Sequence, residues 1–130
     1  WCVSWEGLLL LMANIYGKGD KGKATKLHAL IVRDHGECMK CSTTNALQCA
    51  HIISRKYSWT RTDLDNAFCL CASCHMYFTD NPVEFGQFTI DQIGEANYDL
   101  LLVKRRSIAK MDWSVEAARL HEIAKERGLI

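Results

Sequence analysis

The sequence lacks the features that direct a chain into or across a membrane. The apolar run from Leu8 to Ala13 is far shorter than the roughly 20 residues that a membrane-spanning helix needs. The stretch around it, Trp1 to Tyr16, has neither the positively charged start nor the small-residue cleavage site of a signal peptide. Internal repeats are also missing, which excludes a repeat architecture. We expect no membrane partner and interpret Trp1 to Tyr16 as a short packed helix or an ill-defined extension.

Cysteine, in contrast, is abundant. The chain has 130 residues, 48% of them hydrophobic, which suffices for one compact domain but not for two. Its seven cysteines are an odd number, and in the absence of a secretory signal we expect reduced thiols in a cytoplasmic protein rather than a disulfide framework. Cys2, Cys49 and Cys69 lie outside any ligand spacing and are interpreted as small buried hydrophobic residues.

Two C-x2-C pairs predict a structural zinc site. The four ligands are Cys38, Cys41, Cys71 and Cys74. Each pair turns two thiolates toward one point, and two pairs complete the tetrahedral shell of Zn²⁺. The 29 residues between the pairs leave room for an inserted hairpin. Because zinc would hold this insert against the second pair, we expect His51, Asn66 and His75 to lie near one another.

The charge is unevenly distributed, although its net value is only +1. Residues 17–61 carry nine Lys or Arg against three Asp or Glu, whereas residues 62–130 carry seven against eleven. A basic half that also holds the cysteine and histidine insert favours a polyphosphate partner. A solvated helix face explains the same charges equally well, so charge alone does not decide between the two.

The segment before the first cysteine pair is predicted to contain a linker and a basic helix. Residues 17–22 (GKGDKG) are typical of a flexible linker. From Lys23 to Arg33 apolar residues recur at helical spacing, and Gly36 is suited to end the helix. Lys23 and Lys26 on the polar face are candidate contacts to a phosphate backbone.

The insert is predicted to form two strands around a long loop. Leu47 to Ile53 favours a strand, and Asn66 to Leu70 is the returning strand. The polar residues 54–65 between them read as a surface loop, and loops of this length in a small domain tend to be functional. The second cysteine pair then opens a short helix over about residues 73–78, which Pro82 ends.

The remainder is predicted to be helical. Phe85 and Phe88 are expected core anchors. Thr89 and Gln92 form a capping box that starts a helix reaching about Arg106. The expected apolar stripe of that helix is Ile93, Ala96, Leu100 and Val103. Asp112 or Ser114 is expected to cap a last helix that directs Val115, Ala118 and Ile123 toward the core and ends at Gly128.

His51 is the candidate general base, because a neutral imidazole whose other nitrogen is fixed by a hydrogen bond can take a proton from water. Asn66 can orient the imidazole or the water, or it is simply a turn residue.

His75 can replace Cys74 at the zinc, but the Cys74 thiolate would then have no metal to bind. We expect His75 to face the insert and bind a second, catalytic metal ion. The other histidines, His28, His35 and His121, are interpreted as surface, capping or structural residues.

Basic and aromatic residues alternate in the predicted loop. Arg55 lies four residues after His51, and Arg61 lies further along. Guanidinium groups suit bidentate contact with phosphate. The aromatic residues Tyr57 and Trp59 interleave with the basic residues Arg55, Lys56 and Arg61. This arrangement is compatible with nucleic-acid contact, although either aromatic ring can equally belong to the core.

Together these residues resemble the HNH endonucleases of the ββα-metal type with a four-cysteine zinc site. The resemblance rests on both cysteine pairs, Ala50-His51-Ile52, Ser54-Arg55, Asn66 and Leu70-Cys71-x2-Cys74-His75. The chain is particularly similar to the small HNH proteins of phages and prophages, in which a basic helix precedes the first pair and an Asn-Pro-x-x-Phe stretch follows the second. Here that stretch is Asn81 to Phe85.

The resemblance implies an α+β fold with a small, treble-clef-like ββα-metal core between N- and C-terminal helices. It implies metal-dependent hydrolysis of DNA phosphodiester bonds, with His51 as general base, Asn66 as its positioner and Arg55 in the site. His75 would bind the catalytic divalent cation, Mg²⁺ or Mn²⁺, beside the structural Zn²⁺. The predicted nucleic-acid contacts are Lys23, Lys26, Lys56 and Arg61, and the protein would work in a bacterial cytoplasm, encoded by the host or a phage.

Two positions depart from the family pattern. Many members carry an Asp or His ligand immediately before the base, where this chain has Ala50, and a second ligand four residues after the Cys-His, where it has Thr79. The cation is then held by His75 with waters and phosphate oxygens, or with another ligand such as Asp80 or Cys49.

Two alternatives remain open from the sequence. One is a zinc-stabilised DNA-binding module with a degenerate site, and the other is an interaction domain, for example an assembly partner of a phage packaging enzyme. We divide the chain into an extension and linker (1–22), the zinc domain with its basic helix (23–82) and a helical extension packed on the same core (83–130).

Overall fold

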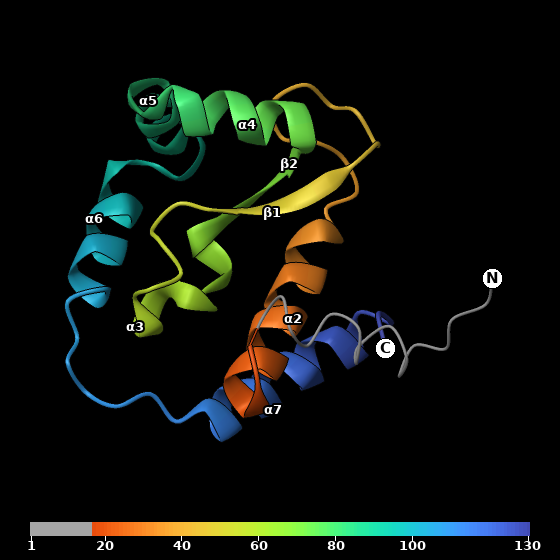
Figure 1. The fold of residues 1–130 in the computed structure, drawn as a ribbon, viewed down its shortest axis with the longest axis vertical. Coiled ribbons are helices and arrows are strands. Elements are labelled where there is room, and N and C mark those ends of the chain that lie inside the picture. The colour runs from red at the N-terminus through yellow and green to blue at the C-terminus, as the bar shows by residue number, and fades with distance from the viewer. Residues whose placement is uncertain (1–16) are drawn as a thin grey trace.

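A computed structural model describes residues 17–130, which form a two-stranded sheet with helices on both sides (Figure 1). The interpretation of Trp1 to Tyr16 lies outside the described residues. Within the described part of the chain, no helix has the length and apolar character needed to cross a membrane. The mixture of helices with one small sheet confirms the α+β class.

The sheet is an antiparallel pair of β1 (Leu47–His51) and β2 (Ala67–Cys71), with Leu47 opposite Cys71 and His51 opposite Ala67. Side chains alternate between the two faces of a strand. Ala50 is therefore buried on one face of β1, while Cys49 and His51 share the other. Helix α4 (Ala72–Asp80) follows β2 directly and completes a ββα unit.

One face of the sheet is covered by aromatic residues. Phe68 of β2 and Phe78 of α4 are buried, and Phe85 and Phe88 of α5 (Pro82–Ile93) pack against them. The rings of Phe85 and Phe88 meet Phe68 edge to face, with centroids 6.0 and 5.2 Å apart. Edge-to-face pairs of this kind add stability beyond their buried area. The prediction of Phe85 and Phe88 as core anchors is confirmed.

A second apolar cluster joins the beginning and the end of the described chain. Helix α2 (Gly19–Arg33) packs against α7 (Trp113–Glu126), and the two run beneath the sheet in the view of Figure 1. The buried residues are Ala24, Leu27, Ile31, Ala117, Leu120 and Ala124. Small residues alternate with leucine along this seam, which lets the two helices approach closely.

The predicted linker is wrong, because residues 19–22 already belong to α2. Gly22 is buried, and a Cβ at this position would lie 2.1 Å from the carbonyl oxygen of Gly17. Glycine is thus required here by a close approach of the backbone, not by flexibility. A glycine-rich composition cannot distinguish these two uses.

The predicted surface loop is largely structured. It contains α3 (Ser58–Arg61) and the 3-10 turn η1 (Leu64–Asn66), and both Thr60 and Thr62 are buried. Asn66 ends the 3-10 turn instead of opening the returning strand, so the alternative reading as a turn residue describes its backbone. Residues 54–66 therefore form an ordered segment that follows β1, and this segment is called the wall of the cleft below.

The long helix predicted to start at Thr89 is also wrong. Thr89 lies inside α5, where its hydroxyl donates to the carbonyl of Phe85 at 2.8 Å. Gly94, with a φ of 83°, separates α5 from α6 (Glu95–Lys104). The break changes which side of the second helix faces inward, so Leu101 is buried whereas Leu100 of the predicted stripe is exposed.

The last helix begins as predicted but presents a different face. Asp112 caps α7 by accepting from the backbone N–H groups of Ser114 and Val115. Val115 and Ala118, both expected in the core, are exposed. The buried residues lie at 117, 120 and 124, and Ile123, also expected in the core, is half-buried against them. Periodicity gave the helix but not its orientation.

Candidate metal centres and active-site cleft

Each C-x2-C pair forms a short turn, or knuckle. The four predicted cysteine ligands come together where the first knuckle, which carries Cys38 and Cys41, meets β2 and α4. The sulfur atoms of Cys38, Cys41, Cys71 and Cys74 all lie within 4.8 Å of one another. The Sγ atoms of Cys41 and Cys71 are 3.7 Å apart. Four thiolates at about 2.3 Å from one tetrahedral zinc would be separated by about 3.8 Å. The site therefore fits a structural Zn²⁺.

Local backbone turns hold these sulfurs in place. The carbonyl of Cys38 accepts from the N–H of Ser42 at 2.8 Å, which closes the first knuckle, and Ser42 adopts a φ of 64° to do so. In the second knuckle, the N–H of Cys74 donates to the sulfur of Cys71 at 3.4 Å. Burial raises the pKa of Cys38, but N–H donors outweigh it and bring the pKa to about 6, so thiolate forms readily.

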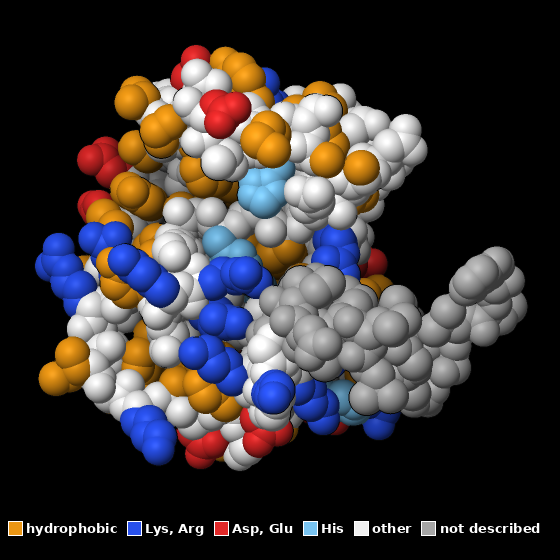
Figure 2. Space-filling model, in the orientation of Figure 1, with side chains coloured by type: hydrophobic (Ala, Val, Ile, Leu, Met, Phe, Trp, Pro, Cys, Tyr) orange, Lys and Arg blue, Asp and Glu red, His pale blue; other side chains and the backbone are white. Residues whose placement is uncertain are grey.

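A cleft of about 420 Å³ opens beside β1, between α2 and the start of α4. Both His51 and His75 line it, together with Arg33 and Arg55. On the face shown in Figure 2, histidine side chains appear in a hollow, and Lys and Arg side chains gather below it. The two predicted active-site histidines thus share one solvent-accessible space.

His51 is oriented by the backbone of the insert. Its Nε2 lies 2.9 Å from the carbonyl oxygen of Arg61. A carbonyl can only accept, so Nε2 carries the hydrogen and Nδ1 carries the lone pair of the neutral ring. Burial, and then the neighbouring His28, lower the pKa of His51 to about 4. The imidazole is therefore unprotonated at neutral pH, as a general base requires.

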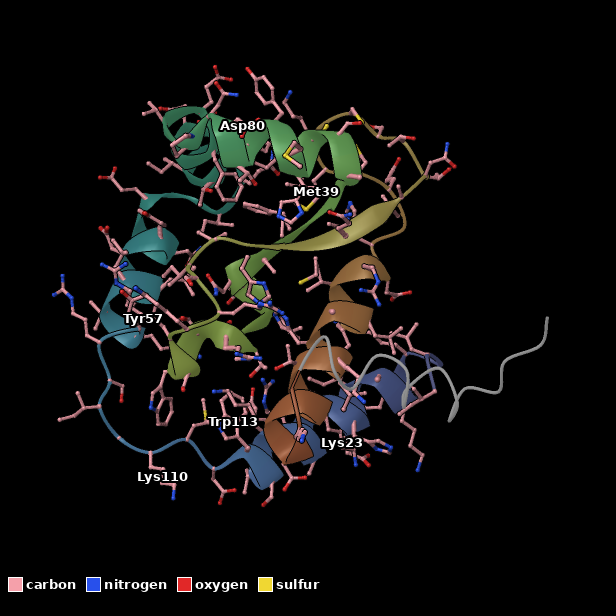
Figure 3. The ribbon with its side chains drawn as sticks, viewed as in Figure 1. Lys23, Met39, Tyr57, Asp80, Lys110 and Trp113 are labelled. Carbon is pink, nitrogen blue, oxygen red and sulfur yellow. The ribbon has the colours of Figure 1, made fainter. Side chains whose placement is uncertain are left out.

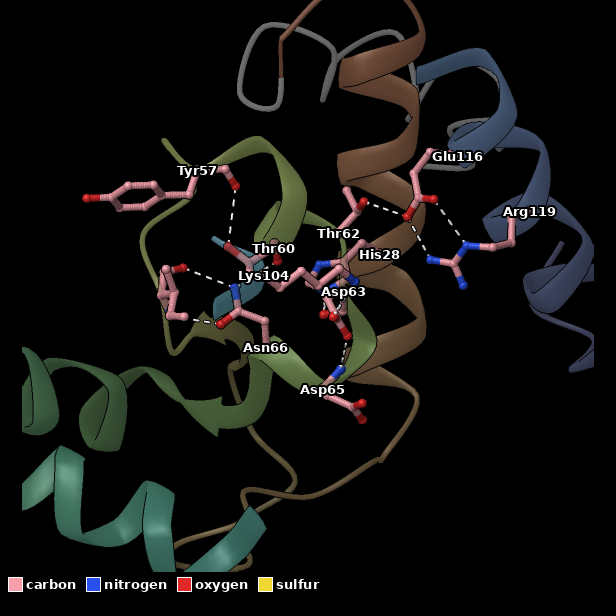
Figure 4. A network of polar contacts seen from close by, with 11 residues as sticks. His28, Tyr57, Thr60, Thr62, Asp63, Asp65, Asn66, Lys104, Glu116 and Arg119 are labelled. Carbon is pink, nitrogen blue, oxygen red and sulfur yellow. Dashed lines mark hydrogen bonds and ion pairs between the residues drawn. The ribbon is translucent and has the colours of Figure 1, made fainter. Parts of the chain in front are cut away.

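Asn66 acts on the loop rather than on the imidazole. It is 0% exposed. Its amide nitrogen donates to the carbonyls of Ile53 and Thr60, and its oxygen accepts from the N–H of Ile53 at 2.8 Å (Figure 4). The carbonyl of Thr60 immediately precedes that of Arg61, which accepts the hydrogen bond from Nε2–H of His51. Asn66 thus positions His51 indirectly, by fixing the turn that carries its acceptor.

His75 lies on the first turn of α4 and faces the cleft, while Cys74 stays in the sulfur cluster. Its Nδ1–H donates to Oε1 of Gln48 at 2.8 Å, which leaves the lone pair on Nε2. An imidazole nitrogen and an amide oxygen are both acceptable ligands for a divalent cation. Gln48 is a candidate that the sequence prediction missed, because nothing in the motif distinguishes it.

The two departures from the family pattern supply no ligand here. Ala50 is buried in the core, and the hydroxyl of Thr79 donates to the backbone carbonyl of His75 at 2.8 Å. Of the two substitutes considered from the sequence, Cys49 lines the cleft. Asp80 lies at the far end of α4 (Figure 3) and does not line the cleft.

The predicted nucleic-acid contacts differ in exposure. Lys23, Lys56 and Arg55 are exposed, whereas Lys26 is half-buried on α2. Arg61 is engaged within the protein. Its Nε donates to Oγ1 of Thr25 at 2.9 Å, and another guanidinium nitrogen donates to the carbonyl of Arg55 at 3.2 Å. Arg61 therefore joins α2 to the wall of the cleft.

Tyr57 and Trp59 contact the segment that follows α6 in the chain. The indole N–H of Trp59 donates to the carbonyl of Ala109 at 2.6 Å. Tyr57 lies beside the end of α6 (Figure 3), with Arg105 5.4 Å and Lys56 5.1 Å from its ring centre. Both rings are half-buried. Their contacts support a packing role in the described structure.

The interpretation of His28 as a surface or capping histidine is wrong. His28 is fully buried, its Nε2 donates to the carbonyl of Asp63 at 2.8 Å, and its Nδ1 lies 3.8 Å from the sulfur of Cys49. Burial lowers its pKa. The helical spacing from Ala24 could have revealed this position, because residue 28 follows it by four on the same face.

The comparisons agree with this geometry. Residues 31–90, a little under half of the chain, match the model of a family described as HNH endonuclease. The matched range contains both cysteine pairs, the sheet and α4. Comparison with curated proteins and with solved structures gave no match. This match supports the resemblance of residues 31–90 to the HNH endonucleases, a family of nucleases.

Proposed function

We propose that this protein is a metal-dependent endonuclease that hydrolyses DNA phosphodiester bonds. The observation that carries the proposal is that His51 and His75 line one open cleft with Arg33 and Arg55. A base, a metal-binding imidazole and cationic side chains around one space are what attack on a phosphodiester requires. The match of residues 31–90 to the HNH endonuclease model supports the same reaction.

In this mechanism His51 takes a proton from the attacking water at Nδ1. The imidazolium that forms keeps its Nε2–H on the Arg61 carbonyl, so the ring does not turn as it charges. Asn66 donates to the carbonyl of Thr60 and thereby fixes the backbone that carries the Arg61 carbonyl, the acceptor of His51. The low pKa of His51 limits its strength as a base, and a positive charge near the water would offset this by acidifying the nucleophile.

His75, with Gln48 beside it, is the proposed protein anchor of the divalent cation, Mg²⁺ or Mn²⁺. When bound, the cation stabilises negative charge on the phosphate and on the leaving oxygen. Arg55, which is exposed and lines the same cleft, is the proposed guanidinium contact to this phosphate. Lys23, Lys26 and Lys56 are proposed contacts to the flanking DNA backbone, and Arg61 supports the loop that contacts it.

The similarity to small phage and prophage HNH proteins suggests a phage-related role in a bacterial cytoplasm. In the proposed organisation, residues 23–82 form the nuclease unit and residues 83–130 a helical extension. The packing of α2 against α7 supports their sharing one core. The helical extension is also a candidate docking surface for a phage packaging protein.

The test is a plasmid-cleavage assay with Mg²⁺, with Mn²⁺ and with a chelator, on the parent protein and on His51→Ala. We expect cleavage only with metal, and a loss of about 10²–10⁴-fold for His51→Ala. His121→Ala on α7 is the matched control, because its side chain is 43% exposed and lies outside the cleft. Failure of the zinc-loaded parent to cleave with either metal would refute the proposal.

The second candidate is a zinc-stabilised DNA-binding module. It is favoured by Ala50 and Thr79, which supply no metal ligand in the cleft. Under this alternative the parent binds DNA with an affinity that falls steeply with salt, His51→Ala binds equally well, and neither protein cleaves. A protein-interaction domain would instead show no salt-dependent binding to DNA.

A further inference from the structure

A second group of side chains that can bind a metal is separate from the four cysteines: Cys49 and His51 line the cleft, and the buried His28 lies next to them. His28 comes from α2, and Cys49 and His51 come from the same face of β1. Their ligand atoms all lie within 4.8 Å of one another. We propose that these three residues form a binding site for Zn²⁺ that inhibits the protein by occupying His51.

The hydrogen bonds of the two imidazoles present them as ligands. His28 donates Nε2–H to the carbonyl of Asp63 at 2.8 Å, and His51 donates Nε2–H to the carbonyl of Arg61 at 2.9 Å. Each ring therefore carries its lone pair on Nδ1. Metal-binding histidines characteristically donate their other N–H to a carbonyl or a carboxylate, which fixes the tautomer and the ring orientation. Both rings already have this arrangement.

The distances are close to those of a bound ion. The sulfur of Cys49 lies 3.8 Å from Nδ1 of His28. Around a tetrahedral Zn²⁺, with bonds of about 2.1 Å to nitrogen and 2.3 Å to sulfur, such a pair would be separated by about 3.6 Å. The rings of His28 and His51 have centroids 5.1 Å apart. The Cys49–His28 pair is thus within about 0.2 Å of the separation that a shared ion would impose.

The donor set selects the kind of ion. Two imidazole nitrogens and one thiolate suit zinc, whereas Mg²⁺ requires hard oxygen ligands. None of the described residues that line the cleft is a carboxylate. Three protein ligands leave a fourth position open toward the cleft, where water would complete the shell. The site would thus discriminate against the proposed catalytic cation.

Binding requires the loss of one proton. Both histidines have lowered pKa values because they are buried, so they enter the site neutral. Burial raises the pKa of Cys49 to about 12, so the thiol is protonated until the ion arrives. Zn²⁺ then forms the Zn–S bond while the S–H proton passes to solvent. The thiolate offsets part of the positive charge that Arg33 and Arg55 bring to the cleft.

The regulatory consequence rests on the proposed nuclease function. Nδ1 of His51 is the atom that would take the proton from water, and the same lone pair would bind Zn²⁺. A zinc-occupied His51 cannot act as base. Filling the site should therefore reduce DNA cleavage by about a hundredfold or more, the contribution expected of a general base.

The experiment counts zinc without using DNA. Protein that carries zinc only in its four-cysteine site is titrated with Zn²⁺ and examined by native mass spectrometry. We expect the parent to take up one further ion and Cys49→Ala to take up none. Cys69→Ala is the matched control, because Cys69 lies directly opposite Cys49 in the sheet but is not a member of the cluster. It should bind the further ion as the parent does.

Cobalt gives a second measurement on the same proteins. Added Co²⁺ should produce a thiolate-to-cobalt absorption band in the parent and in Cys69→Ala but not in Cys49→Ala. Retention of the first zinc shows that each variant is folded. A parent that takes up no further ion, or a Cys49→Ala protein that takes it up unchanged, would overturn the site.

The two proposals fail separately. If the parent binds the further zinc but does not cleave DNA with any metal, the nuclease function fails and the zinc site stands. If the parent cleaves DNA with Mg²⁺ and the further zinc binds without slowing it, the inhibitory role is overturned.

Discussion

The two metal-ligand clusters of this protein are built in different ways. The four cysteines lie in two short knuckles, each closed within a few residues by a hydrogen bond from a backbone N–H, to a carbonyl in the first and to the Cys71 sulfur in the second. The cluster of His28, Cys49 and His51 is assembled by packing α2 against β1, across 21 residues of sequence. Local spacing thus identifies each half of the first cluster, although the fold brings the two halves together across 30 residues. No local spacing links His28 to the other two members of the second cluster.

The difference has a consequence for stability. A structural metal bound by the four cysteines would join the first knuckle to β2 and α4 and so hold the insert together. The cluster of His28, Cys49 and His51, here called the histidine cluster, lies on elements that other contacts already hold. These contacts are the packing of α2 against α7 and the hydrogen bonds of Asn66. We therefore expect the first cluster to be needed for folding and the second to be dispensable for it.

The largest expected effect is that of removing a cysteine ligand. Cys41 is exposed, so Cys41→Ser removes a zinc ligand with little loss of packing. Structural zinc contributes on the order of 10 kcal/mol to small domains, and we expect loss of zinc together with the cooperative unfolding transition. Zinc content and thermal melting measure both. Cys49→Ala should keep the transition, and equal damage by the two changes would remove the distinction between the clusters.

Asn66→Ala should produce the next largest effect. The change leaves the carbonyls of Ile53 and Thr60 and the N–H of Ile53 without their side-chain partner in a buried environment. We expect a loss of about 3 kcal/mol in the free energy of unfolding, measured by urea denaturation.

Asn97→Ala is the control for Asn66→Ala, because Asn97 also donates to a backbone carbonyl but from an exposed position on α6. It should cost less than about 1 kcal/mol. If Asn66→Ala were equally mild, the wall of the cleft would not depend on Asn66. Zinc content should remain at the parent level in both variants.

The sequence predicted what depends on local spacing. The cysteine cluster, the ββα order and the core role of Phe85 and Phe88 follow from motifs and from short-range patterns. His51 and His75 are brought to one cleft as expected, because strand, knuckle and helix follow one another directly.

What the sequence did not predict depends on contacts between distant segments. His28 has no ligand partner at a motif spacing, and only the docking of α2 on β1 places it beside Cys49. The indirect action of Asn66 was missed for the same reason, since its partners are backbone atoms of a folded loop. The inward faces of α6 and α7 were misassigned because helical periodicity does not specify the side on which a neighbour packs.

A smaller effect is expected from the pH dependence of stability. Burial lowers the pKa of His51 to about 4 in the folded protein, from its ordinary value of 6.5. The unfolded chain therefore binds the proton first as the pH falls below about 6.5, and stability decreases from there toward pH 4. Between pH 7.5 and 5.5 we expect the parent to lose about 1 kcal/mol more than His51→Gln.

This comparison is made by urea denaturation at the two pH values, with zinc present only in the four-cysteine site. The site must be filled at both pH values, which the measured zinc content verifies. An identical loss in parent and His51→Gln would show that His51 is not buried as a neutral ring. The histidine cluster would then be open to water and less suited to hold an ion.

The smallest expected effect concerns the outer support of the histidine cluster. Nζ of Lys104 on α6 lies 2.6 Å from the carboxylate of Asp63, whose backbone carbonyl accepts from His28. The lysine side chain is 44% exposed, so its ion pair is weakened by solvent. Lys104→Met should therefore lower the free energy of unfolding by no more than about 0.5 kcal/mol. The zinc titration should be unchanged, because the carbonyl that holds His28 is fixed by the turn of η1 and not by the lysine. A marked loss of the further zinc in Lys104→Met would show instead that α6 helps to assemble the cluster.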